Sequence, residues 1–158
     1  MKTSVKLFAF LVALLGVFSC AASRSTPQEP WRIEVVTTGG FAGRGAGNYA
    51  VDHEGSVSAK LFNGNSCTFR LTEDELRRIR ELLAKARPRE WKESYVPENP
   101  CCDRIEYTLT VDEAGVQSKT TWIDDPLPRP ADLVALADAI IGGEAASIRM
   151  LATTRCER

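Results

Sequence analysis

The sequence predicts an α+β domain in which an antiparallel sheet of about four to six strands packs two helices on one of its faces. Segments of alternating apolar and polar residues come in pairs that are separated by short turns, as in hairpins. Two further segments carry apolar residues at helical spacing, and few connections are long enough for a parallel crossover. Together these observations favour sheet and helices in separate layers.

The first strand is predicted over residues 31–37, where Trp31, Ile33 and Val35 alternate with polar positions. The chain then enters residues 39–47, a loop with five glycines. Residues 49–52 and 57–62 flank a short turn at Gly55, which predicts a hairpin.

A helix is predicted to begin after Thr72, because Thr72 and Glu75 have the spacing of a capping box. The apolar residues that follow recur at intervals of three and four and form one stripe: Leu76, Ile79, Leu83 and Ala86. Pro88 ends this helix, since proline lacks the amide that the next turn requires.

The second half of the chain predicts a clear hairpin, with strands over residues 104–111 and 116–123 and a turn at residues 112–115. A second helix follows Pro130 and ends at Gly142 and Gly143. Its apolar face consists of Leu133, Leu136, Ala137, Ile140 and Ile141. Residues 147–154 are interpreted as a last edge strand.

The first 19 residues have the layout of a secretory signal, with Lys2 and Lys6 before an apolar run too short to span a bilayer comfortably. The run ends in Val17-Phe18-Ser19-Cys20, which resembles a bacterial lipobox, so Cys20 is expected to carry the lipid and to become the first mature residue. The alternative is an ordinary signal with a chance cysteine. Residues 20–30 are small, polar and proline-bearing, as in a flexible tether, and residues 31–158 form one domain.

The signal and the lipobox together predict an exported lipoprotein of the bacterial cell envelope. Ala21 follows Cys20 in place of the aspartate that commonly retains lipoproteins at the inner membrane, which favours the outer membrane, with the domain facing the periplasm. Contact with the membrane is expected through the acyl chains alone, because no second apolar stretch is long enough to cross it.

The charge balance gives no reason to expect a nucleic-acid partner. Removal of Lys2 and Lys6 leaves 18 basic residues against 21 acidic ones. A chain near charge −3 has no strongly basic face that would attract phosphates.

Four cysteines besides Cys20 predict two disulfides in an oxidising compartment: Cys67, Cys101, Cys102 and Cys156. Ring strain disfavours a bond between the neighbours Cys101 and Cys102, so each is expected to reach Cys67 or Cys156. A zinc site is the weaker alternative, because the chain has no Cys-x-x-Cys pair and His53 is its only histidine. We expect no metal and no cofactor.

Catalytic arrangements are also not evident, and the protein is not expected to be an enzyme. His53 lies in the predicted hairpin turn, which is a poor support for a nucleophile and its base. Glu73, Asp74 and Glu75 are explained by helix capping, and Asp124 and Asp125 by a loop before prolines. The glycine loop lacks the Gly-Lys-Ser/Thr signature and the following helix of a phosphate-binding loop.

Phe41 is the unusual feature of the glycine loop, because it is a large apolar residue among glycines and alanines. Small neighbours allow the ring to project and the backbone to approach another surface closely. The alternative is that Phe41 folds down onto the core as a lid.

The start of the domain, Ile33-Glu34-Val35-Val36-Thr37-Thr38-Gly39-Gly40-Phe41-Ala42-Gly43, resembles the opening of the emfourin family, small protein inhibitors of thermolysin-like zinc metallopeptidases. The later order of a Leu-rich helix, a hairpin at residues 107–115 and a closing Leu-rich helix is similar too. The resemblance implies that Gly39, Gly40, Phe41, Ala42 and Gly43 form the inhibitory loop, with Phe41 as its anchor, and that the partner is a thermolysin-like metallopeptidase.

The function expected from these features is that of a membrane-anchored inhibitor of secreted metallopeptidases. The alternative is a non-catalytic envelope lipoprotein that binds a protein or cell-wall partner through the same loop. A hydrolase with an unrecognised site is the weakest of the three.

Overall fold

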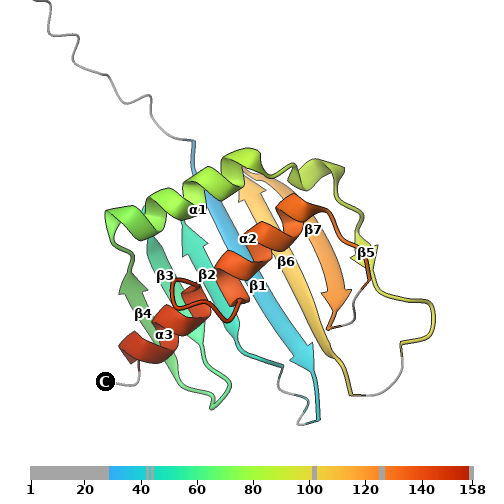
Figure 1. Cartoon of the computed structure of the whole chain (residues 1–158). Helices are drawn as coiled ribbons and strands as arrows, with labels where there is room; N and C mark the ends of the chain where they lie inside the picture. The colour runs from blue at the N-terminus through green and yellow to red at the C-terminus, as the bar shows by residue number, and fades with distance from the viewer. Residues whose placement is uncertain (1–28, 42, 44, 101–102, 125–126, 157–158) are drawn as a thin grey trace, which may run out of the picture.

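Strand β1 (Trp31–Gly39) is the middle strand of a seven-stranded sheet in the computed structural model of the chain (Figure 1), which describes residues 29–41, 43, 45–100, 103–124 and 127–156. The other strands are β2 (Asn48–Asp52), β3 (Ser56–Lys60), β4 (Ser66–Arg70), β5 (Ser94–Tyr95), β6 (Ile105–Glu113) and β7 (Val116–Ile123). The helices are α1 (Glu73–Lys85), α2 (Ala131–Ile141) and α3 (Ile148–Cys156), and η1 (Pro88–Glu90) is a single 3₁₀ turn.

The strand order is β4-β3-β2-β1-β6-β7-β5. Every pair is antiparallel except β5 with β7, which is parallel. The α+β class is therefore confirmed, whereas the sheet is mixed and larger than the antiparallel one expected. The two unforeseen strands, β4 and β5, are five and two residues long and lie at the edges. Edge strands need fewer apolar residues than central ones and leave a weaker pattern in the sequence.

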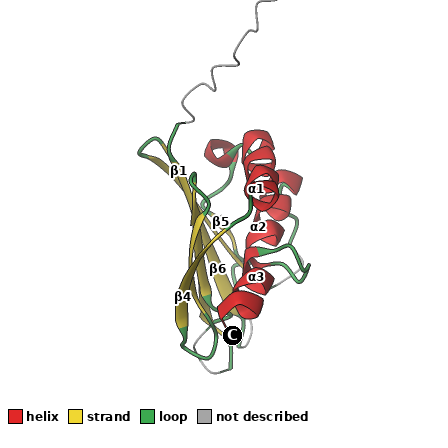
Figure 2. Cartoon of the chain, turned by 90° about the vertical axis from the view of Figure 1, so that its left-hand side faces the viewer, coloured by secondary structure: helices red, strands yellow, loops and turns green. Residues whose placement is uncertain are grey.

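One face of the sheet carries the core and all three helices, and the other face is open (Figure 2). The alternation in β1 decides this, because Ile33 and Val35 point to the helices and are fully buried, while Arg32 on the other face is exposed. Leu109 and Val111 of β6 extend the same buried layer.

Helix α1 has the start and the face that its sequence predicted. The Thr72 hydroxyl accepts from the Glu75 amide, and the Glu75 carboxylate accepts from the Thr72 amide at 2.8 Å, which completes the capping box. Leu76, Ile79 and Leu83 are its buried residues. The acidic first turn complements the positive end of the helix dipole.

Helix α2 also agrees with the prediction, and Gly142 caps its end. The segment after it was predicted wrongly: residues 148–156 form α3 and not an edge strand. The Ser147 hydroxyl accepts from the Met150 amide at 3.4 Å and donates to the Gly142 carbonyl at 2.8 Å, so it closes α2 and starts α3. Ile148 and Ala152 then turn one face of α3 toward the core.

The two ends of the sheet carry different connections of the chain. At one end, which we call the entry end, the chain enters β1 and the β6–β7 turn lies beside it, since the Ala114 amide donates to the Pro30 carbonyl at 2.9 Å. At the other end, the loop end, β1 leads into β2 and β3 leads into β4 (Figure 1). Nine extended residues separate the two ends by about 26 Å. No helix in the described part of the chain is long and apolar enough to cross a membrane.

Candidate binding loop

The glycine loop, residues 39–47, connects the two central strands β1 and β2 at the loop end of the sheet. Gly39 is the last residue of β1 and pairs with Ile105, the first residue of β6. Of the predicted site residues, Gly39, Gly40, Phe41 and Gly43 lie together here, and Ala42 lies outside the described residues. A loop attached to the two middle strands has the most rigid support that the sheet can offer.

The backbone of the loop needs glycine at several positions. Gly39, Gly40, Gly43, Gly45 and Gly47 all have positive φ, between 65° and 104°. A Cβ at Gly39 would overlap the carbonyl oxygen of Arg104, and one at Gly45 would overlap the Thr37 carbonyl. At these positions the backbone therefore takes conformations that residues other than glycine adopt only with strain.

Three backbone hydrogen bonds hold the path of the loop, one to the residue before β6 and two within the loop. The Gly40 amide donates to the Arg104 carbonyl at 2.9 Å, the Gly45 amide donates to the Gly39 carbonyl at 2.9 Å, and the Gly43 amide donates to the Gly40 carbonyl at 2.8 Å. The last bond closes a tight turn with Phe41 at its second position.

Thr37 is the support beneath the loop that sequence reasoning missed. Its side chain is buried, and its hydroxyl donates to the Gly47 carbonyl at 2.6 Å and accepts from the Ala46 amide at 2.7 Å. The Asn48 side chain adds a third bond, since its Oδ1 accepts from the Thr37 amide at 3.0 Å. The sequence does hold a sign of this role, because Thr37 is a polar residue at an inward position of β1, two residues after buried Val35.

Tyr49 ties the loop to the core. Its hydroxyl donates to the Ala46 carbonyl at 3.2 Å while the ring is buried. Burial raises the pKa of the Tyr49 phenol, and nearby Arg149 opposes that rise. The hydroxyl therefore remains a hydrogen-bond donor at neutral pH.

Phe41 projects from this support into solvent, with 97% of its surface exposed. The structure thus has the projecting arrangement and not the lid over the core. A fully exposed phenyl ring on a tightly bonded backbone is the arrangement that a binding anchor requires, because the loop loses little freedom when the ring is buried by a partner.

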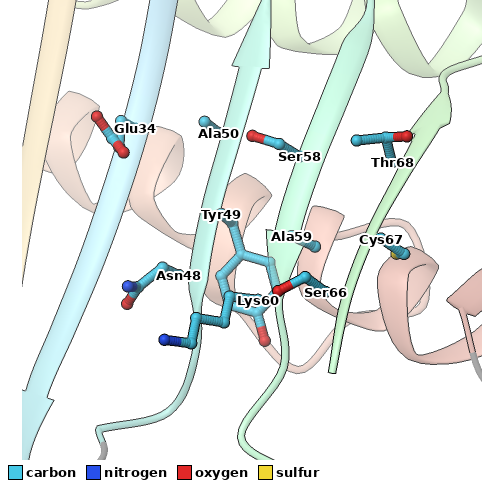
Figure 3. Close-up of a pocket in the computed structure, with 10 residues that line it drawn as sticks. All are labelled: Glu34, Asn48, Tyr49, Ala50, Ser58, Ala59, Lys60, Ser66, Cys67 and Thr68. Atoms are coloured by element: carbon cyan, nitrogen blue, oxygen red, sulfur yellow. The ribbon is translucent and has the colours of Figure 1, made fainter. Parts of the chain in front are cut away.

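The open face of the sheet beside the loop carries a shallow hollow of about 430 Å³ (Figure 3). Glu34, Ala50, Ser58 and Thr68 form one row across the strands, and Asn48 and Lys60 lie nearer the loop end. These side chains form no pair of nucleophile and base. The hollow is a surface of mixed polar and apolar atoms next to the loop.

Cys67 and Cys156 form a disulfide that joins β4 to α3, with their Cα atoms 5.9 Å apart. The presence of a disulfide agrees with the sequence, but the expectation that Cys101 and Cys102 each bridge to one of these cysteines is wrong. Cys67 points to the helical face of an edge strand that the sequence did not predict, directly under α3. Cys101, Cys102 and the proposed lipid site Cys20 lie outside the described residues.

The remaining candidates have structural roles. His53 lies in the β2–β3 turn at the entry end, where its carbonyl accepts from Arg80 at 2.9 Å. Glu75 belongs to the cap of α1, and Asp124 follows the last residue of β7. Within the described ranges, no group of three or more His, Cys, Asp or Glu residues could hold a metal ion.

Comparisons of the chain with protein families, with curated proteins and with solved structures give no match. The glycine loop itself is therefore the feature of the molecule from which a function can be inferred.

Proposed function

We propose that the protein is a membrane-anchored inhibitor of secreted zinc metallopeptidases of the thermolysin-like class, acting through residues 39–43. The observation that carries the proposal is the 97% exposure of Phe41 on a loop whose backbone is bonded on several sides. The resemblance of this segment to the emfourin opening supplies the class of target, which admits a bulky apolar residue just after the cleavage point.

Burial of the Phe41 ring contributes part of the binding energy in this proposal. Transfer of a phenylalanine side chain from water into an apolar pocket is worth about 1.5–3 kcal/mol. The bonds from Gly40 to Arg104 and from Gly45 to Gly39 keep the loop in shape before binding, so little of that gain is spent on ordering it.

The same bonds explain how the loop would resist cleavage. Peptidase clefts bind their substrates as extended strands, whereas Gly40 has a φ of 70° and its carbonyl accepts from Gly43 across a tight turn. The backbone at Gly40 and Phe41 could become extended in the cleft only if that turn broke. While the turn is intact, Phe41 can occupy the enzyme's pocket and the peptide bond before it stays out of line for attack.

The ends of the sheet are suited to an anchored inhibitor. A lipid on Cys20 would reach the domain through residues 20–30, which lead to the entry end at Pro30. The glycine loop is at the loop end, about 26 Å away along β1. An outer-membrane anchor would thus leave Phe41 facing the periplasm, where an exported peptidase could meet it.

The test is a titration of the purified full-length protein, in mild detergent, into a thermolysin-like peptidase, with residual activity as the readout. We expect loss of activity that reaches completion near equimolar amounts and deepens with time of incubation. Full activity at a large excess of the protein would contradict the proposal. Capture of an envelope component without any effect on peptidases would favour the alternative, a non-catalytic lipoprotein that binds through the same loop.

A further inference from the structure

A second phenylalanine is exposed at the same end of the sheet as Phe41. In the described part of the chain, three large apolar side chains are exposed: Phe41, Phe62 at 58% and Val116 at 48%. Phe62 lies between β3 and β4 at the loop end, whereas Val116 begins β7 at the entry end. Exposed aromatic side chains that gather at one end of a molecule mark a contact surface more often than scattered ones do.

The two loops present their phenylalanines in the same way. The Gly64 amide donates to the Leu61 carbonyl at 2.9 Å, which places Phe62 at the second position of a tight turn, as the bond from Gly43 to Gly40 does for Phe41. Both turns close on a glycine of positive φ, 90° at Gly64 and 66° at Gly43.

Neither closing glycine is needed for close packing. A Cβ at Gly43 or at Gly64 would meet nothing within 4 Å. The glycines therefore serve the shape of the turn, and with it the position of the ring.

The β3–β4 loop is held as firmly as the glycine loop. The Leu61 amide donates to the Asn65 carbonyl at 2.8 Å, and the Asn63 side chain accepts from the Asn65 amide at 2.9 Å. Leu61 is buried, so the residue just before Phe62 is fixed in the core. Phe62 is consequently a positioned side chain and not a free one.

The spacing of the two turns fits a single cleft. The β1–β2 and β3–β4 connections are two strand positions apart in the sheet, which corresponds to about 10 Å. An extended peptide covers about 10 Å with three residues. The β1–β2 and β3–β4 connections lie at the same end of the sheet (Figure 1), so two side chains at this spacing can enter one peptidase cleft side by side.

A cavity of about 270 Å³ lies against Phe62, between the bases of the two loops. Its lining consists of Gly47, Asn48, Lys60, Leu61, Phe62 and Gly64. The lining is mainly apolar and Lys60 is the one charged residue in it, so a carboxylate or carbonyl group that protrudes from the partner would meet the cation of Lys60 beside an apolar surface.

We propose that Phe62 is a second anchor for the same partner, so that the protein grips the substrate cleft of a metallopeptidase with Phe41 and Phe62 together and receives an acidic or carbonyl-bearing group of the cleft's rim beside Lys60. This inference rests on the proposed function and extends it from one loop to two. The position of chain entry supports it, because the tether joins the opposite end of the sheet and leaves both turns free for a large partner.

The experiment compares inhibition constants toward a thermolysin-like peptidase for the full-length protein and for Phe41→Ala, Phe62→Ala and Val116→Ala. Val116 is the matched control, since it is also apolar and about half exposed but lies at the entry end. We expect Phe62→Ala to raise the inhibition constant at least about tenfold and Val116→Ala to change it less than about twofold. Thermal unfolding of each variant checks that the fold is kept.

The outcomes separate the two proposals. If the unchanged protein inhibits and Phe41→Ala weakens it while Phe62→Ala behaves as Val116→Ala does, the second anchor is refuted and the first one stands. If the unchanged protein does not inhibit, both proposals fail. A weakening by Phe62→Ala that disappears when Phe41 is already alanine would show that both rings enter the same cleft.

Discussion

The rigidity of the glycine loop can be tested by comparing Gly45→Ala with Gly43→Ala. The two glycines have nearly the same φ, 65° and 66°, so alanine meets the same backbone penalty at both. They differ in space, because a Cβ at Gly45 would overlap the Thr37 carbonyl and one at Gly43 would meet nothing within 4 Å. The difference between the variants therefore isolates the cost of displacing the loop.

The magnitudes follow from the contacts. A left-handed alanine costs about 1–2 kcal/mol, and the stiffer unfolded chain returns about half of that, which leaves about 1 kcal/mol for Gly43→Ala. In Gly45→Ala the shift away from Thr37 also endangers the bond from Gly45 to the Gly39 carbonyl and the bond from Ala46 to the Thr37 hydroxyl. At about 1 kcal/mol for each bond, the total is about 3 kcal/mol.

Urea unfolding of both variants measures these free energies. We expect Gly45→Ala to lose about 2 kcal/mol more stability than Gly43→Ala, with an unchanged dependence on urea concentration. Inhibition of the peptidase should weaken more in Gly45→Ala as well, because Phe41 then leaves its place. Equal losses within about 0.5 kcal/mol would refute the view that contacts with Thr37 fix the loop.

Three further predictions concern the supports of the fold. Replacing Cys67 and Cys156 together by alanine should lower the free energy of unfolding by about 4 kcal/mol, because the bond closes a segment of 89 residues; a loss below about 1 kcal/mol in urea unfolding would contradict this. Thr37→Val removes the hydroxyl under the glycine loop and should cost about 2 kcal/mol, with weaker inhibition, whereas an unchanged inhibition constant would show that the loop does not depend on it. Burial raises the pKa of Glu75, but hydrogen bonds from the Thr72 amide and from Arg155 more than offset this effect and hold the pKa below its ordinary 4.5. The free energy of unfolding should therefore fall as the pH drops below about 4.5, and it should fall less steeply in Glu75→Gln. Parallel pH profiles of the two proteins would refute this role of Glu75.

The sequence was most informative where local chemistry decides the structure. The capping box at Thr72 and the stripe of Leu76, Ile79 and Leu83 specify α1 almost by themselves. The alternation in β1 and in the β6–β7 hairpin likewise reports which face is buried. These patterns need no knowledge of the rest of the chain.

The predictions that failed depend on contacts between distant segments. Residues 148–156 are too short to show a clear period, and the cap at Ser147 is a weak signal without its bond to Gly142. The pairing of Cys67 with Cys156 requires α3 to lie over β4, and neither element was foreseen. The prediction excluded a bond between the neighbours Cys101 and Cys102, and local sequence carries no information on the contact between α3 and β4 that pairs Cys67 with Cys156.

The candidate loop was found from sequence, but its geometry was not. Phe41 among glycines indicated an unusual turn, and only the folded chain decides between a ring in solvent and a ring on the core. Phe62 was missed because it looks ordinary in its own segment, and Thr37 was missed because a polar residue at an inward position does not reveal which groups it bonds. Their importance comes from lying under the glycine loop and beside it.

The most direct test of the account is the inhibition constant of Phe41→Ala, measured with the full-length protein against a thermolysin-like peptidase. Truncation of a ring that anchors an interface costs about 2–4 kcal/mol, more than the transfer of the ring alone, because the partner's pocket is also left unfilled; this corresponds to a rise of roughly thirty- to a thousandfold. Because Phe41 is 97% exposed, the free energy of unfolding should stay within about 0.5 kcal/mol of the original. An inhibition constant equal to that of the unchanged protein would contradict the central claim.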